Sequence, residues 1–440
     1  MARIFSDRSR IQAMLDVEAA LARAEAACGV IPDAAARAIG AAARAENFDA
    51  ETLAEDVLKG GNLAIPLVKA LTALVAASDE EAARWVHWGA TSQDIIDTGL
   101  VLQMREALTV IAAQLEAVGN RLATLSEDHA ETPMVARTLM QQAIPTTLGF
   151  KIAGWLSALT RARQSLDALK PRLLVLQFGG AAGNLASLAP DGIRISQAMG
   201  RELRLTLPEL PWHTQRDRIA EAGAALAILL GSLGKMARDL ALMSQTEIGE
   251  FSEPSGGGRG GSSALPHKAN PVACARIIAA AKRAPGLAAT LISAMDQEHE
   301  RGLGGWHAEW EVLPELFQLA SGALEAACLL AEHGHFNTDR MRANLALTAG
   351  LVMTEAVSIA LGRKIGKAAA HNLLERAAQK AAAEKLPLRA CLEADPEIAP
   401  HFDSTELDAL FAPENHLGAA PDFARQAAAS WRRLSRSAQD

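Results

Sequence analysis

Residues 215–248 read QRDRIAEAGAALAILLGSLGKMARDLALMSQTEI, and this stretch decides the fold class. Its apolar side chains recur at steps of three and four residues, as Ile219, Ala222, Leu226, Leu229, Leu233, Met236, Leu240 and Met243. This spacing places them on one face of an α-helix. The predicted helix is far longer than the usual three or four turns, so its apolar face needs long partner helices.

Windows without proline extend the same helical pattern through the chain. They cover residues 67–132, 146–170, 212–253 and 315–386, and they are rich in strong helix formers. Residues 98–127 and 146–170 repeat the apolar spacing, and few segments alternate with a period of two. Pro145 is expected in the first turn of a helix. The sequence therefore predicts an all-α protein with a central bundle of long helices.

Breaks in the helical pattern suggest three domains. Segments 85–97, 132–145 and 255–271 interrupt it, and further prolines with shorter helical stretches follow residue 340. We expect an N-terminal helical domain at 1–97, a central long-helix domain at 98–340 and a small C-terminal helical domain at 341–440. The glycine-rich segment 255–271 would be a loop of the central domain.

Composition excludes several classes of protein. The chain has 43 Lys and Arg against 51 Asp and Glu, a net charge of −8, which disfavours nucleic acid and anionic membrane as partners. No run of about 18 uncharged apolar residues occurs, so we expect no membrane-spanning helix. The N-terminus lacks the pattern of a signal peptide. The cysteines are widely spaced, which favours a reducing cytoplasm over a zinc ribbon or a disulfide framework: Cys28, Cys274, Cys328 and Cys391.

The glycine-rich segment 255–271 reads SGGGRGGSSALPHKANP and is the first candidate functional site. Its glycines cannot be fixed by side-chain packing, and polar groups follow them directly: Ser262, Ser263, His267, Lys268 and Asn270. Mobile glycines followed by hydroxyl, cationic and amide groups suit a lid that closes over a substrate. A solvated linker is the alternative interpretation.

Two further segments carry polar groups at breaks between helices. Residues 87–94 read HWGATSQD, where Thr91 and Ser92 could bind a ligand or cap the next helix. Residues 136–145 read ARTLMQQAIP, where Arg137, Thr138 and Gln141 could reach a ligand from the approach to a helix. Taken alone this segment is a weak signal, because an arginine such as Arg137 is more often a partner in a surface ion pair.

Acidic residues and histidines also gather at Glu298, His299, Glu300, His307, Glu309 and Glu311. The spacing lacks the His-Glu-x-x-His pattern of a helical zinc site. We expect a polar helix face here rather than a metal site.

Taken together, the three polar segments resemble the conserved blocks of the fumarase/aspartase superfamily, in the same chain order. The signature loop of that superfamily reads Ser-Ser-x-Met-Pro-x-Lys-x-Asn-Pro, and residues 262–271 read SSALPHKANP, with Leu265 at the methionine position. The resemblance implies a homotetramer with a core of twenty helices. It also implies active sites that three subunits share, and chemistry without a metal or organic cofactor.

One departure separates branches of the superfamily. Lyases that act on adenylosuccinate or argininosuccinate usually carry a histidine acid after the Arg-Thr pair, where this chain has Leu139. Segments 178–183, 211–218, 297–301 and 306–311 are similar to the cycloisomerase branch, which also lacks that histidine. The resemblance implies lactonisation of 3-carboxy-cis,cis-muconate to 4-carboxymuconolactone in protocatechuate breakdown. A C–N lyase stays open because His87 matches a histidine of the adenylosuccinate type, and so does an inactive helical scaffold.

The resemblance also implies roles for individual residues. Lys268 would stabilise the negative charge that develops on the substrate, and Ser262 or Lys268 would deliver the proton. A tricarboxylate also needs several cations and hydrogen-bond donors around it. The implied substrate-binding residues are His87, Thr91, Ser92, Arg137, Thr138, Gln141, Arg216, Ser263, Asn270 and Arg301.

Overall fold

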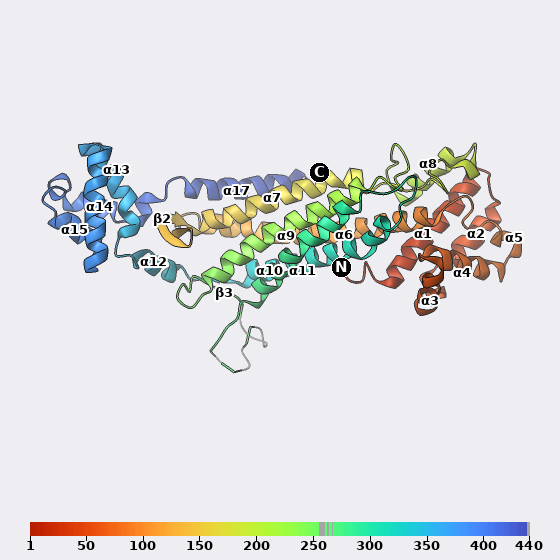
Figure 1. The fold of residues 1–440 in the computed structure, drawn as a ribbon, viewed down its shortest axis with the longest axis horizontal. Helices are drawn as coiled ribbons and strands as arrows, with labels where there is room; N and C mark the ends of the chain where they lie inside the picture. The colour runs from red at the N-terminus through yellow and green to blue at the C-terminus, as the bar shows by residue number, and fades with distance from the viewer. Residues whose placement is uncertain (255–259, 262–263, 266, 438–440) are drawn as a thin grey trace. The chain divides into compact units, whose positions relative to one another are not determined.

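The computed structural model describes residues 1–254, 260–261, 264–265 and 267–437, and helices dominate it (Figure 1). The long helices are α6 (Ser92–Asp128), α7 (Leu148–Leu173), α9 (Asp217–Met243), α10 (Val272–Ser293) and α11 (Gly305–His333). They contain the window 98–127, all but the first two residues of 146–170 and most of 215–248, so the all-α prediction is confirmed. Helix α9 ends at Met243, the last residue of the apolar stripe, and Ser244 Oγ donates to Leu240 O at 2.7 Å just after it.

Shorter elements flank these helices. The N-terminal part contains α1 (Asp7–Ala27), α2 (Asp33–Ala42), α3 (Ala50–Gly60), α4 (Ala64–Ala76) and α5 (Glu80–Ala83). Helix α8 spans Gly192–Leu203. After α11 come α12 (Thr338–Ala346), α13 (Thr354–Ile365), α14 (Lys367–Glu384), α15 (Leu388–Ala394), α16 (Ser404–Leu410) and α17 (Ala420–Ser437). The strands are short: β1 (Pro133–Thr138) pairs with β2 (Gln141–Thr147), and β3 (Phe251–Ser252) with β4 (His335–Phe336).

The chain divides into two compact units, and the long helices contribute to both. Unit 1 consists of Met1–Gln114, Ala162–Gly231 and Ala280–Gly322; unit 2 consists of Leu115–Arg161, Ser232–Ala279 and Ala323–Asp440. This division cuts across the central domain expected at 98–340. The three-domain scheme remains a prediction.

Close helix packing fixes the interior of unit 1. A Cβ at Gly223 of α9 would lie 2.3 Å from Leu291 of α10 and 3.4 Å from Leu316 of α11. These three helices therefore pack closely at this glycine, and a larger residue there would require the Leu291 side chain to move. Gly99 of α6 similarly lies against Met14 of α1, at 3.3 Å from a built Cβ. Helix α1 also packs against α2 and α8.

Unit 2 is organised around α17 and the β1–β2 hairpin. The buried Trp431 of α17 lies on Gly119 of α6, and its Nε1 donates to Asn120 Oδ1 at 2.8 Å. Val135 of β1 packs with Leu345 and Met353, which attaches the hairpin to the segment around α12. Helices α13, α14 and α15 lie next to one another (Figure 1), and their buried side chains form a separate small core.

Segment 132–145 does interrupt the helices, but the expectation that Pro145 begins a helix was wrong. The segment is a β-hairpin, and Pro145 lies in β2 opposite Val135, three residues before α7 begins. Proline lacks an N–H, but a two-stranded ribbon has free edges where this absence is tolerated. Helix periodicity in the neighbouring windows gave no signal for so short a hairpin.

The exclusion of a membrane-spanning helix was also too strong. By length and composition alone, α9 and α11 are apolar enough to cross a membrane, with mean hydropathies of 1.4 and 1.2 in their best windows. The bent pair Thr338–Ala346 and Leu351–Ile365 passes the same test together. The sequence criterion demanded windows without any charge, whereas windows with one or two charges also pass. About half of the α9 and α11 windows is buried inside the chain, at 50% and 56%.

Candidate active site

The first polar segment forms a tight turn before α6. His87 and Gly89 have φ angles of +58° and +71° in this turn. A Cβ at Gly89 would lie 2.5 Å from Leu188, so the turn needs glycine there. Thr91 and Ser92 stand at the start of α6 and are partly exposed, as expected for residues that cap a helix or bind a ligand. Their contact with a substrate remains a prediction.

Asp94 anchors this turn to two other segments of unit 1. Its carboxylate is fully buried and accepts the backbone N–H groups of Gly179 at 3.0 Å and Gly180 at 2.9 Å. It also accepts from Thr91 N at 3.1 Å and pairs with His213 Nε2 at 2.8 Å. Charge-assisted hydrogen bonds of this kind are stronger than neutral ones. Asp94 therefore fixes the positions of segments 87–94, 178–183 and 211–218 relative to one another.

His87 is joined to a carboxylate of α1. Its Nδ1 lies 2.6 Å from Oε1 of Glu18, and Glu18 is 1% exposed while the histidine side chain keeps 19% of its surface accessible. Burial opposes protonation of the ring, but the Glu18 carboxylate, with a smaller contribution from Asp94, outweighs it and raises the pKa of His87.

Arg216 is enclosed in a buried ionic cluster. Its guanidinium donates to Asp97 at 2.7 and 3.1 Å and to Glu309 Oε1 at 2.9 Å, with a further bond to Glu309 Oε2. The side chains of all three are 1% exposed, and Trp306 Nε1 donates to Asp97 at 2.9 Å. Burial raises the pKa of Glu309 against the opposing effect of Arg216. This geometry favours a positioning role for Arg216 over the predicted contact with substrate.

Arg301 lies in the same unit beside the glycine turn. Its guanidinium donates to the carbonyl of Ala181 at 2.8 Å and more weakly to that of Gly180 at 3.4 Å. Both contacts are to backbone carbonyl oxygens, so neither supplies an acid that compensates the positive charge of Arg301. Arg301 thus remains suited to an anionic ligand, as predicted.

The second polar segment lies on the β1–β2 hairpin in unit 2. Arg137 forms a bidentate pair with the fully buried Glu250, at 2.9 and 2.7 Å, and Asn344 Nδ2 donates to the same carboxylate at 2.7 Å. Glu250 compensates the charge of Arg137 and attaches the hairpin close to its tip. The ion-pair alternative for Arg137 is therefore present, with a buried partner instead of a surface one.

The tip of the hairpin is exposed and apolar. Leu139 and Met140 are 97% and 71% exposed, with φ angles of +49° and +68°. Bulky side chains in the left-handed region cost about 1 kcal/mol or more each. Thr138 and Gln141 flank the tip and are also exposed, so their polar groups are free to meet a ligand. Leu139 offers no proton at this position.

The third polar segment is only partly described. Ser262 and Ser263 lie outside the described residues. Lys268 is exposed, and Asn270 donates its backbone N–H to Gly260 O at 2.8 Å. Gly260 has a φ of +66°, and a Cβ there would lie 2.7 Å from Asn270 O, so this closure requires glycine. Glu253 closes the base of the segment by accepting Ala273 N and Cys274 N of α10, at 2.9 and 2.8 Å.

The predicted site residues fall into two sets. Unit 1 carries His87, Thr91, Ser92, Arg216 and Arg301, and unit 2 carries Arg137, Thr138, Gln141, Lys268 and Asn270. Sequence reasoning missed the carboxylates that organise them, namely Glu18, Asp97, Glu250 and Glu309. Asp94 and Glu309 stood inside segments singled out above, but Glu309 was expected on a polar helix face and is buried instead. The ion pairs were missed because they join residues far apart in sequence and leave no local pattern.

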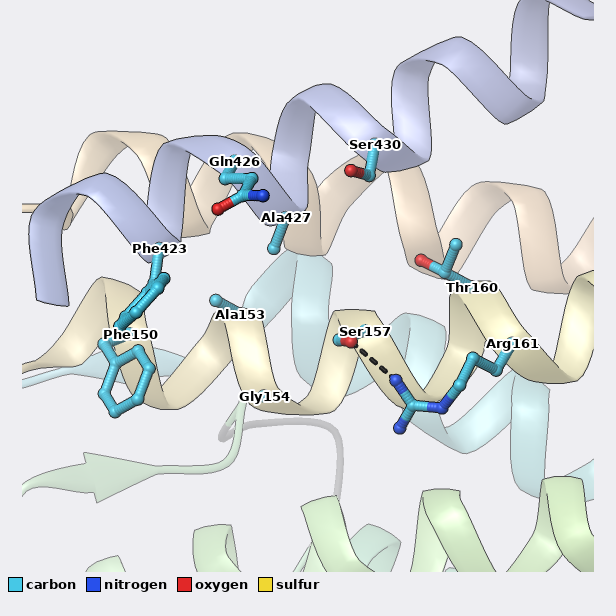
Figure 2. Close-up of a pocket in the computed structure, with 10 residues that line it drawn as sticks. All are labelled: Phe150, Ala153, Gly154, Ser157, Thr160, Arg161, Phe423, Gln426, Ala427 and Ser430. Atoms are coloured by element: carbon cyan, nitrogen blue, oxygen red, sulfur yellow. Dashed lines mark hydrogen bonds between the residues drawn. The ribbon is translucent and has the colours of Figure 1, made fainter. Parts of the chain in front are cut away.

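A larger cavity of about 460 Å³ contains none of these residues. It lies between α7 and α17, with Phe150 and Phe423 facing each other at one end and Arg161 bonded to Ser157 at the other (Figure 2). A smaller cavity of about 100 Å³ adjoins Gly260 and Asn270.

Comparison with known proteins identifies the family. Residues 1–286 match the family model described as lyase, and residues 350–427 match the adenylosuccinate lyase C-terminus. The chain belongs to the lyase family. Its all-α fold is that of fumarase and aspartase, and membership implies an enzyme that works as an oligomer.

Similar proteins carry more specific names. The 3-carboxy-cis,cis-muconate cycloisomerase of Pseudomonas aeruginosa is 54% identical, over 98% of this chain and 94% of that protein. The crystal structure of 3-carboxy-cis,cis-muconate lactonizing enzyme from Pseudomonas putida matches with a TM-score of 0.95 and 51% identity, over 99% and 97% of the chains. Nitrosuccinate lyase of Streptomyces davaonensis is 44% identical, over 96% of this chain and 90% of that protein.

Replacing the two arginines of unit 1 separates their roles. Arg216→Met leaves Asp97 and Glu309 buried without their cation, which costs about 3–5 kcal/mol of stability. Arg301→Met removes only contacts to carbonyl groups, so we expect a nearly unchanged thermal melt and a raised KM for an anionic substrate. A melting curve and steady-state kinetics on both variants check this. An Arg216→Met protein that melts like the parent but does not bind substrate would restore the predicted substrate contact.

Proposed function

We propose that this chain is a cycloisomerase that converts 3-carboxy-cis,cis-muconate to 4-carboxymuconolactone. The observation that carries the proposal is near-full-length similarity, at 54% identity, to an enzyme of that name. The apolar hairpin tip supports it, because Leu139 stands where a lyase of the superfamily would carry its acid. The reaction belongs to the protocatechuate branch of the β-ketoadipate pathway, and four free cysteines suit the cytoplasm.

The chemistry is an internal addition that loses no atoms. A carboxylate oxygen of the substrate attacks a carbon of the conjugated double bond and forms the lactone C–O bond. Electron density moves into the neighbouring carboxylate, and the adjacent carbon then takes a proton. Cations close to that carboxylate lower the barrier, because they bind the transition state more tightly than the ground state.

Lys268 is the residue we assign to this stabilisation. It is exposed on the loop after Gly260, and Asn270 lies two residues further on, where it can orient a carboxylate oxygen. Ser262 or Lys268 delivers the proton to carbon. Arg301 and His87 supply positive charge from unit 1, while Thr91, Ser92, Thr138, Gln141 and Ser263 supply hydrogen bonds. Arg137 and Arg216 position these groups through Glu250, Asp97 and Glu309. The reaction needs no metal or organic cofactor.

A C–N or related elimination lyase is the second candidate. The match of residues 350–427 to the adenylosuccinate lyase C-terminus and the 44% identity to nitrosuccinate lyase favour it. Both candidates share proton transfer at a carbon beside a carboxylate. They differ in whether a leaving group departs, and elimination is aided by an acid that Leu139 cannot supply. An inactive scaffold would convert none of these substrates.

We also propose a homotetramer in which the long helices form a core of twenty helices and three subunits complete each site. Apolar side chains on these and neighbouring helices remain exposed in the single chain, with Phe150 at 42%, Ile292 at 54% and Phe423 at 51%. Burying such surface against further copies removes it from water. Packing between the long helices of a tetramer in water would also bury the apolar faces of α9 and α11, so these faces do not require a membrane.

Parallel assays separate the candidate functions. We expect the purified protein to lactonise 3-carboxy-cis,cis-muconate and to leave adenylosuccinate, argininosuccinate and nitrosuccinate unchanged. Lactonisation is measured as the loss of ultraviolet absorbance of the muconate.

A substitution of Lys268 tests the role of the loop. Lys268→Met keeps the length of the stem and deletes the charge, so we expect kcat to fall on the order of a hundredfold or more. Lys282→Met, a substitution on α10, serves as the control. Turnover of a succinate derivative alone would establish the lyase, and a near-parental Lys268→Met rate would remove the loop from the mechanism.

Sedimentation tests the assembly. We expect a single species of four times the 46.4 kDa chain mass at micromolar concentration. The apolar faces of the long helices would make a monomer prone to aggregation. A stable, active monomer would contradict both the twenty-helix core and the sharing of sites between subunits.

A further inference from the structure

Glu18 and His87 form a buried contact that the proposed chemistry does not yet use. The two residues are 69 positions apart, and the 2.6 Å contact joins the middle of α1 to the turn before α6. Glu18 is 1% exposed, whereas His87 keeps part of its surface open. With Nδ1 committed to Glu18, the remaining polar atom of the ring is Nε2. A carboxylate buried behind a partly exposed histidine fixes both the orientation and the charge of the ring.

The charges around His87 are all negative. Glu18 acts on it from α1 and Asp94 from α6, and Asp94 is itself compensated by His213 and three backbone N–H groups. Among the described residues, no cation contributes to the shift in the pKa of His87. Without a charged imidazolium, the buried Glu18 carboxylate would lack a counter-charge.

A second buried carboxyl on α1 does not compete for this proton. Glu25 lies seven residues after Glu18 and is 0% exposed, and neither of its oxygens has a hydrogen-bond partner in the described part of the chain. Burial, with a contribution from Glu18, raises the pKa of Glu25 to about 9. Glu25 is therefore neutral at pH 7 and adds no negative charge beside the pair of Glu18 and His87.

We propose that Glu18 is a positioning residue that keeps His87 as an imidazolium, so that Nε2–H binds one carboxylate of the substrate. The inference deepens the proposed function, because it names how unit 1 recognises a polycarboxylate. A neutral imidazole could donate only one proton and would carry no charge toward the ligand. The imidazolium donates from both nitrogens at once, to Glu18 and to the substrate.

The direction of the pH dependence follows from the raised pKa. A histidine with a raised pKa stays charged below that value and loses its proton as the pH rises through it. Substrate affinity should therefore weaken on the alkaline side, once His87 becomes neutral. Removing the negative charge of Glu18 lowers the pKa of His87, so this alkaline limb should move to lower pH.

The experiment compares Glu18→Gln with Glu25→Gln in the full-length protein. Glu18→Gln keeps an oxygen to accept from Nδ1–H but deletes the charge. At a pH between the His87 titration midpoints of parent and variant, we expect the KM for 3-carboxy-cis,cis-muconate to rise about tenfold, the value for losing one charge-assisted hydrogen bond, with a smaller change in kcat. Glu25→Gln replaces a neutral carboxyl by a neutral amide on the same helix, and its pH profile should match that of the parent.

A second readout does not depend on turnover. In protein with isotope-labelled histidine, the His87 ring signal, assigned by its loss in His87→Asn, should titrate above the ordinary value of about 6.5 in the parent. It should titrate lower in Glu18→Gln. If the protein turned out not to lactonise carboxymuconate, this titration would still test the pair. A parental His87 that titrates at or below the ordinary value of about 6.5, or an alkaline limb that stays in place in Glu18→Gln, overturns the inference.

Discussion

The buried carboxylate of Asp94 is the interaction on which unit 1 depends. It accepts from Thr91, Gly179, Gly180 and His213, which brings together three chain segments that are separate in sequence. A buried carboxylate must find this many donors, because an uncompensated charge in the interior costs several kcal/mol. The turn that carries His87 and the glycine turn that receives Arg301 are thus fixed by one side chain.

In unit 2 the buried carboxylate of Glu250 joins separate chain segments, as Asp94 does in unit 1. Glu250 compensates Arg137, binds Asn344 and so attaches a hairpin whose exposed tip carries apolar residues. In both units a buried carboxylate fixes the position of the backbone. Other polar side chains, such as Lys268, remain exposed. The three arginines were all predicted to bind substrate, but their surroundings differ. Arg137 and Arg216 are compensated by buried acids, and Arg301 is not.

The sequence predicted those features that rest on local periodicity or on a linear motif. The stripe from Ile219 to Met243 predicted α9, and the segments around Thr91, Arg137 and Lys268 identified the superfamily. It missed the hairpin, because two short strands next to Pro145 give too little period-two signal. It also missed Glu18, Glu250 and Glu309, because their partners lie 69, 113 and 93 residues away and only folding brings them together. Ser262 and Ser263 lie outside the described residues, so their roles remain predictions.

The central claim is that segments from different subunits act on one substrate, and hybrid tetramers test it most directly. Assayed well below KM, His87→Asn in unit 1 and Lys268→Met in unit 2 should each keep about a tenth or less of the parental activity. Co-expression with two affinity tags yields tetramers that contain both variants, and sites that draw the two segments from different copies escape both substitutions. We predict recovery of about a quarter of the parental activity from equal amounts, as random assembly allows. Doubly tagged tetramers with no more activity than the separate variants would contradict the account.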